Sequence, residues 1–196
     1  MSIIINKMIM KKIKIILLLS FLNSFLQCKA QQFYSLNTNM KDIPQGGYVK
    51  DINNELSPFV GIYKANYQGN EVTIYISKVE YMLKKRSNKS YYMDALIVKY
   101  KVKNSSGTVL QDTQNNNSGD FYSMWSAPEE NAVVLYYPGT NCGVGWGKVY
   151  LYKKNATQLS WDYRPNDSIL DQQNCPGNQD IKIYLPITKD LIFTKQ

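Results

Sequence analysis

The residues that could do chemistry in this chain are few, because histidine is absent from the sequence. Its absence excludes Ser-His-Asp and Cys-His nucleophilic sites, histidine general bases and most zinc sites. An enzyme would have to work with carboxylates, Tyr, Lys or Arg. Glu129 and Glu130 form the adjacent carboxylate pair, but a turn that follows Pro128 exposes both side chains. We therefore predict no catalytic residue, no metal site and no cofactor.

Two polar loops resemble ligand-binding loops only in composition. Residues 143–147, Gly-Val-Gly-Trp-Gly, lead into a strand-like segment, whereas a dinucleotide loop must open a helix. Residues 112–120 are rich in oxygen ligands, but they lack the spacing and the final Glu of a calcium loop. We expect neither loop to bind a ligand. Asp162 follows Trp161 on an alternating segment, so we expect it to face outward in a solvated or cross-strand role.

Cys142 and Cys175 are the cysteines outside the N-terminal region, and an even pair in an exported chain predicts a disulfide. Metal binding is the alternative, and it needs more ligands than these two. Asp167-Ser168-Ile169 resembles the acceptor for O-glycosylation that some bacterial exported proteins carry. The alternative for Ser168 is a turn residue without a sugar.

The first thirty residues have the parts of a secretory signal peptide. Lysines at 11–14 precede an apolar run at 15–22, and Cys28-Lys29-Ala30 ends in a small residue. Cleavage after Ala30 predicts an exported protein, periplasmic or extracellular. Acylation of Cys28 is the alternative, and it would give an outer-membrane lipoprotein; we expect membrane contact only in that case. Met1 and Met10 both remain open as the start.

Removal of this leader makes the chain weakly basic. The whole sequence has 23 Lys and Arg against 15 Asp and Glu, a net charge of +8. The leader holds five lysines and no acidic residue, so 18 basic and 15 acidic residues remain, a net charge of +3. The basic cluster at 84–89 is expected to be a solvated turn. We predict no nucleic-acid partner, because such proteins carry a strongly basic stripe.

Alternation of apolar and polar residues predicts strands along most of the mature chain. Residues 96–103 put apolar side chains on one face and lysines on the other, and residues 159–163 alternate in the same way. We expect a basic loop or hairpin tip at 82–90 and a further strand at 181–185. About nine strands at regular spacing predict an all-β antiparallel meander that closes into a barrel, with a β-sandwich as the alternative.

The segment 56–64, Leu-Ser-Pro-Phe-Val-Gly-Ile-Tyr-Lys, starts the first predicted strand. Phe59, Gly61 and Tyr63 share one face, and Gly61 leaves space that a neighbouring ring could fill. This F-x-G-x-Y motif resembles the G-x-W element that opens lipocalin-like (calycin) barrels, with Tyr63 at the tryptophan position. The chain also resembles small secreted bacterial proteins of uncharacterised function, which share a K-A-Q signal end, this strand and two late cysteines. The resemblances imply a barrel and no particular activity.

We predict a signal peptide at 1–30, an extended lead-in segment at 31–54 and a single β-barrel-like domain at 55–196. Barrels of about eight strands hold one small ligand or are filled by side chains. Our first hypothesis is a non-catalytic, monomeric binder of a small apolar ligand, in which Tyr63, Tyr100, Trp161 and Tyr163 line the ligand or form the core. The alternative is a cell-surface interaction or inhibitor module that acts through its loops. Exposed aromatic residues outside the barrel would favour this alternative.

Overall fold

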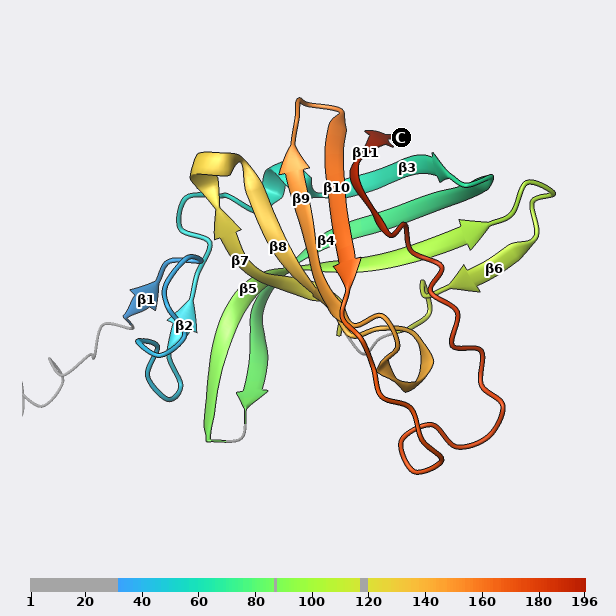
Figure 1. Ribbon diagram of the computed structural model, residues 1–196. Coiled ribbons are helices and arrows are strands. Elements are labelled where there is room, and N and C mark those ends of the chain that lie inside the picture. Colours follow the sequence, from blue (N-terminus) through green and yellow to red (C-terminus); the bar gives the residue numbers. More distant parts are fainter. Residues whose placement is uncertain (1–31, 87, 117–119) are drawn as a thin grey trace, which may run out of the picture. The chain divides into compact units, whose positions relative to one another are not determined.

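The computed structural model of the protein describes residues 32–86, 88–116 and 120–196 (Figure 1). The predicted leader, with Cys28 and the cleavage after Ala30, lies outside these residues. Residues 33–196 form one structural unit. In the described ranges, no helix has the length and apolar character needed to cross a membrane.

Eight antiparallel strands of the described chain close into a barrel. They are β3 (Gly61–Tyr67), β4 (Asn70–Arg86), β5 (Lys89–Lys103), β7 (Tyr122–Ala127), β8 (Ala132–Tyr137), β9 (Gly147–Lys153), β10 (Gln158–Pro165) and β11 (Thr188–Lys195). Each pairs with the next, and β11 pairs with β3. At the seam between β5 and β7, Ile97 lies opposite Tyr122. The predicted all-β barrel is therefore confirmed over the sandwich alternative.

Short elements decorate this barrel. β6 (Val109–Asp112) pairs with the end of β5, while β2 (Tyr48–Val49) runs parallel to the start of β5 and β1 (Phe33–Tyr34) runs parallel to β2. The 3-10 turns are η1 (Ser57–Phe59), η2 (Pro128–Glu130) and η3 (Asn141–Gly143). In Figure 1, β3 and the first half of β4 lie in the barrel wall, and the far ends of β4 and β5 project from it on the side of β1 and β2.

Buried carboxylates join the lead-in segment to the barrel. Asp94 on β5 is 1% exposed and accepts hydrogen bonds from the Tyr48 hydroxyl at 2.5 Å and from the Asp51 N–H at 3.0 Å. The Asp51 carboxylate in turn accepts from the Lys78 ammonium at 2.6 Å and from the Leu56 N–H at 3.2 Å. Because a buried charge is costly unless it is paired, these contacts fix the described part of the lead-in to β4 and β5.

Two segments differ from the sequence-based expectation. Residues 82–86 and 89–90, predicted as a basic loop or hairpin tip, form the end of the β4–β5 hairpin, but the strands stay paired there after a bulge between Val79 and Met82. Lys85 and Arg86 are exposed there, which is compatible with a strand because one face of an antiparallel pair can be solvated. Residues 181–185, predicted as a strand, form none. Leu185 is buried instead, and the Trp161 Nε1–H donates to the Pro186 carbonyl at 2.9 Å, so this segment packs on the barrel without pairing in it.

The first strand begins where its motif predicts, but the space at Gly61 is not filled by an aromatic ring. Phe59 and Tyr63 are buried, and η1 precedes β3. Gly61 has φ +149°, and a Cβ built there would lie 2.6 Å from Cε of Lys195. The aliphatic part of Lys195, rather than an aromatic ring, therefore occupies this space, and the Lys195 ammonium donates to the Val60 carbonyl at 3.0 Å.

Candidate functional site

The four residues predicted to line a ligand or form the core lie in the packed interior. Tyr63 and Trp161 are 0% exposed, Tyr163 is 1% exposed and Tyr100 is 3% exposed. The rings of Trp161 and Tyr163 meet edge to face, with centroids 6.2 Å apart. Tyr137 joins the same cluster, 5.7 Å from Tyr163 and 6.2 Å from Tyr100. These rings fill this part of the barrel interior.

Burial also sets the chemistry of these phenols. It raises the pKa of Tyr63, Tyr100, Tyr137 and Tyr163 above the ordinary tyrosine value. The Tyr100 and Tyr137 hydroxyls lie 3.1 Å apart and share a hydrogen bond, and the Tyr163 hydroxyl donates to the Gly145 carbonyl. The neutral phenols of Tyr100, Tyr137 and Tyr163 therefore act as buried hydrogen-bonding groups, whereas the buried Tyr63 hydroxyl has no hydrogen-bond partner among the described residues.

A hollow beside Tyr100 is too small for a typical ligand. It has a volume of about 90 Å³, and its lining includes Phe121 and Tyr137. Small-molecule sites usually occupy about 300–1,000 Å³. A hollow of that size lies on the outside of the barrel instead.

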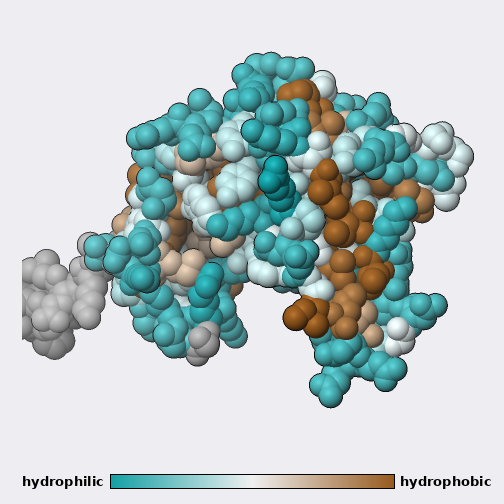
Figure 2. All heavy atoms as spheres, in the orientation of Figure 1, coloured by the Kyte–Doolittle hydropathy of each residue, from teal (hydrophilic) through white to brown (hydrophobic). Residues whose placement is uncertain are grey.

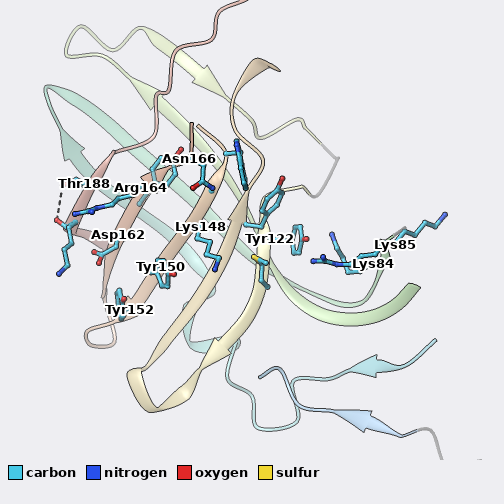
Figure 3. Close-up of a pocket in the computed structure, with 17 residues that line it drawn as sticks. Lys84, Lys85, Tyr122, Lys148, Tyr150, Tyr152, Asp162, Arg164, Asn166 and Thr188 are labelled. Carbon is cyan, nitrogen blue, oxygen red and sulfur yellow. Dashed lines mark hydrogen bonds between the residues drawn. The ribbon is translucent and has the colours of Figure 1, made fainter. Parts of the chain in front are cut away.

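A groove of about 870 Å³ crosses the outer face of β7, β8, β9 and β10 (Figure 3). Its floor consists of outward-facing, half-buried side chains: Tyr122, Met124, Tyr136, Tyr150, Tyr152 and Asp162. Strand alternation explains this floor, because Leu135, Val149 and Tyr163 point into the barrel and their neighbours must point out. In the space-filling view, the surface is hollowed between the hairpin tip and the long loop that follows β10 (Figure 2).

One row of outward-facing residues is continuous across four strands of the groove. Tyr122 lies opposite Tyr136, Tyr136 opposite Lys148, and Lys148 opposite Arg164. Neighbouring strands lie about 4.8 Å apart, so the row extends over about 14 Å. In the next row, Tyr150 lies opposite Asp162. The β-sheet register thus places two tyrosines and then two cations side by side.

The β4–β5 hairpin forms one wall of the groove through Lys84, Lys85 and Arg86. The Lys84 ammonium lies 3.4 Å from the centroid of the Tyr122 ring, a cation–π contact. Burial lowers the pKa of Lys84, and burial raises the pKa of Tyr122. The basic cluster that we expected to be a solvated turn is instead half-embedded against the barrel at Lys84.

The opposite wall combines an exposed indole with polar and basic residues. Trp146 is 43% exposed, and its Nε1–H donates to the Asp167 carbonyl at 3.3 Å. The Trp146 carbonyl also accepts a hydrogen bond from the Asn166 N–H at 2.8 Å. Arg164 and Lys189 add two exposed cations to this wall. The hydrogen bonds on both sides of Trp146 hold its ring at the edge of the groove.

The disulfide supports this wall. Cys142 and Cys175 are bonded, with Cα atoms 5.3 Å apart, which confirms the prediction. The bond joins the glycine-rich segment before β9 to the long loop after β10. Gly145 has φ +76°, and a Cβ there would lie 2.6 Å from Cδ1 of Ile183, so the segment packs closely on that loop. As expected, Gly147 begins a strand rather than a helix.

Charge is concentrated in the groove. Among its described lining residues, Lys84, Lys85, Arg86, Lys148, Arg164 and Lys189 are basic and Asp162 is acidic, a net of +5. The rest of the chain after residue 30 has the remaining 12 basic and 14 acidic residues, a net of −2. The groove is therefore a basic site, whereas the rest of the chain after residue 30 is nearly neutral, and such a concentration of positive charge attracts anions.

The other predicted residues lie apart from the groove floor. Glu129 and Glu130 are exposed in η2. The Ser168 hydroxyl donates to the Gly143 carbonyl at 3.1 Å and lies beside Ile169, which is 89% exposed. The described residues contain no group of three or more Cys, Asp or Glu side chains placed to hold a metal ion.

Sequence reasoning placed Asp162 on an outward face and noted the basic cluster at 84–86, but it assigned neither of them to a binding site. Lys148, Tyr150, Tyr152 and Arg164 were available as the complement of the predicted inward face. What the sequence lacked was the register that aligns them with Tyr122 and Tyr136 on β7 and β8.

Comparison with known proteins adds a family and no activity. Neither the curated proteins nor the solved structures gave a match to the chain. Residues 10–196 match a family described as "Family of unknown function (DUF6705)". This match includes the whole barrel, both disulfide cysteines and all the residues of the groove, and the chain belongs to this family.

Proposed function

We propose that this protein is a non-catalytic binding protein whose ligand, an extended anion, lies in the outer groove. The observation that carries the proposal is the cross-strand row Tyr122–Tyr136–Lys148–Arg164, with Lys84 packed on its first ring. Tyrosine rings supply flat apolar contact and hydroxyl groups, and Lys and Arg supply charge. An open groove that crosses four strands suits a long ligand better than a compact one.

The interior is less suited to this role. A lipocalin-like barrel is supported by its eight strands and by the Phe59–Tyr63 motif after a short turn. Ligands of such barrels need a lumen, whereas Trp161 and its neighbours leave little room here. The surface-module alternative is therefore favoured over a small apolar ligand, with one change: the site combines a sheet face with loops.

A single acidic residue in the described lining favours binding over hydrolysis. Glycoside hydrolysis, for example, commonly uses two carboxyl groups that flank the bond. Asp162 has no such partner among the lining residues, and its carboxylate accepts the Asp190 N–H at 2.6 Å.

We also propose that the chain works outside the cytoplasm. The disulfide supports this compartment, because such bonds persist in oxidising environments. In this proposal residues 1–30 are a leader, and the remainder is exported as a monomer, soluble unless Cys28 is acylated. The N-terminal residue of the exported protein, determined by mass spectrometry, tests it: Gln31 or an acylated Cys28 is expected, and a retained apolar run contradicts it.

The binding proposal is tested by comparing dextran sulfate with neutral dextran on the purified protein. We expect binding to dextran sulfate that Lys148→Ala with Arg164→Ala weakens by about tenfold or more at an ionic strength of about 0.1 M. Lys41→Ala with Lys103→Ala removes the same charge outside the groove and serves as the control. Equal losses in the two double variants would refute the proposal, as would the absence of groove-dependent binding to any anionic polymer.

A further inference from the structure

We infer that the ligand of the groove is an acidic polysaccharide, a chain of sugar rings that bears carboxylate or sulfate groups. This inference rests on the proposed function and adds the class of ligand. It is carried by the distribution of the groove's side chains, because cations, aromatic faces and a carboxylate occupy different places along it.

Five of the six cations lie toward the two ends of the groove. Lys84, Lys85 and Arg86 lie on the hairpin wall, and Arg164 and Lys189 lie on the opposite wall, as Figure 3 shows for Lys84, Lys85 and Arg164. Between them, Lys148 lies opposite Tyr136 and Asp162 lies opposite Tyr150, so charged side chains and tyrosine rings are interspersed in the floor. Such a site suits a chain in which charged groups are interspersed with flat sugar rings. Arg164 matches a carboxylate or a sulfate well, because its guanidinium can donate two parallel hydrogen bonds.

The aromatic side chains offer the contacts that sugar rings need. A sugar presents an apolar C–H face and a rim of hydroxyl groups, and Tyr and Trp likewise combine an apolar ring with a polar tip. Tyr150 and Tyr152 stand nearly parallel on the same strand, with centroids 6.5 Å apart and an angle of 13° between the rings. Trp146 presents its exposed indole from the wall, held by its own hydrogen bond to Asp167. These rings are positioned before any ligand arrives.

Asp162 distinguishes this ligand from single-stranded nucleic acid. A protein that binds a nucleic-acid strand follows its phosphates with a continuous positively charged groove. Here a carboxylate lies in the floor, opposite Tyr150 and two residues before Arg164 on the same strand. It would repel a phosphate backbone, whereas it can accept hydrogen bonds from sugar hydroxyls. A carboxylate has about four acceptor positions, and the hydrogen bond from the Asp190 N–H uses one of them on Oδ1.

The test measures binding of the purified protein to polygalacturonate, dextran sulfate, neutral dextran and oligothymidylate. We expect one or both acidic polysaccharides to bind more tightly than neutral dextran and oligothymidylate, and the first two probes distinguish carboxylate from sulfate as the anionic group. Trp146→Ala should weaken polysaccharide binding by about tenfold, the loss of one well-placed aromatic contact. The control is again Lys41→Ala with Lys103→Ala, which should have little effect.

Asp162→Asn gives the sharpest result. It makes the groove more positive, so a ligand held by charge alone would bind more tightly to the variant. Loss of a charged acceptor for sugar hydroxyls should instead weaken polysaccharide binding, while the amide oxygen still accepts the Asp190 N–H. Tighter binding of polygalacturonate or dextran sulfate to Asp162→Asn would overturn the inference.

The outcomes separate this inference from the function on which it rests. If oligothymidylate bound most tightly, and if Lys148→Ala with Arg164→Ala weakened its binding, the polysaccharide assignment would be wrong. The groove would then remain an anion-binding site. Binding of no probe that depends on the groove would overturn both.

Discussion

Trp161 provides the most direct test of a filled interior. Its side chain is fully buried and contacts the rings of Phe193 at 5.5 Å, Tyr163 at 6.2 Å and Phe121 at 6.5 Å between centroids. Burial of about 200 Å² of a large aromatic contributes about 5 kcal/mol at 25 cal/mol per Å². Measured Trp→Ala changes in protein cores cost about 3–5 kcal/mol. We therefore expect Trp161→Ala to lower the free energy of unfolding by about 4 kcal/mol.

A smaller substitution separates packing from hydrogen bonding. Trp161→Phe keeps most of the apolar volume but removes the Nε1–H donor to the buried Pro186 carbonyl. An unpaired buried acceptor costs about 1–3 kcal/mol. This variant should therefore fall between the native protein and Trp161→Ala.

Urea unfolding followed by circular dichroism measures both variants, because fluorescence changes when a tryptophan is removed. Trp146→Ala is the matched control: its indole is 43% exposed, so its stability should change by less than about 1 kcal/mol. If Trp161→Ala were as stable as Trp146→Ala, the interior would not be packed around Trp161. That result would support a ligand site inside the barrel.

Three further predictions concern the disulfide, alkaline pH and the first strand. Replacing Cys142 and Cys175 together by Ser should cost up to about 3.7 kcal/mol in the chain-entropy model, because the bond closes a separation of 33 residues; an unchanged melting temperature would contradict this. Stability should be constant up to about pH 10 and then fall by about 1.4 kcal/mol per pH unit for each affected tyrosine, because unfolded tyrosines ionise while burial keeps Tyr100 and Tyr163 neutral; urea titrations that show a rise above pH 10 would refute it. Gly61→Ala should cost about 1–2 kcal/mol by chemical denaturation, more than Gly107→Ala, since both have positive φ but a Cβ at Gly107 meets open space; equal costs would show that Lys195 yields without strain.

The inward faces of the strands could be predicted from the sequence because burial acts on each residue separately. Leu96, Val98 and Tyr100 alternate with lysines, and Leu159 and Trp161 alternate with polar residues. All five are buried in the structure. A period of two is sufficient to assign a face whenever one side of a strand is covered.

Two segments were assigned less well, because their burial does not follow the pattern of an ordinary barrel strand. Residues 82–86 carry three basic residues and therefore resemble a loop, yet they continue β4 beyond the bulge because β5 pairs with them. Residues 181–185 alternate like a strand, but their backbone pairs with none of the described strands. Leu185 is buried because the segment lies against the barrel, and a hydrophobic pattern alone does not distinguish this packing from β pairing.

The groove was not predictable for a different reason. Its residues come from β4, β7, β8, β9 and β10, and only the register brings Tyr122, Tyr136, Lys148 and Arg164 into one row. The net charge of residues 31–196 also conceals the site, since the net of +5 in the groove is partly offset by a net of −2 elsewhere. A linear basic cluster at 84–86 was visible, whereas the contribution of Lys148, Arg164 and Lys189 depends on tertiary structure.

The two faces of the barrel wall should respond differently to substitution, which follows from strand alternation. Val149 and Tyr163 point inward and are fully or almost fully buried, so changes there reduce stability. Lys148 and Arg164, one residue away on the same strands, point outward and are exposed, so changes there should affect binding and leave the fold intact. A filled interior makes this separation possible: rings packed inside keep the sheet rigid, and a rigid sheet holds the outer row in register without help from a ligand. Groove substitutions that unfolded the protein would therefore contradict both the filled barrel and the assignment of its outer face to binding.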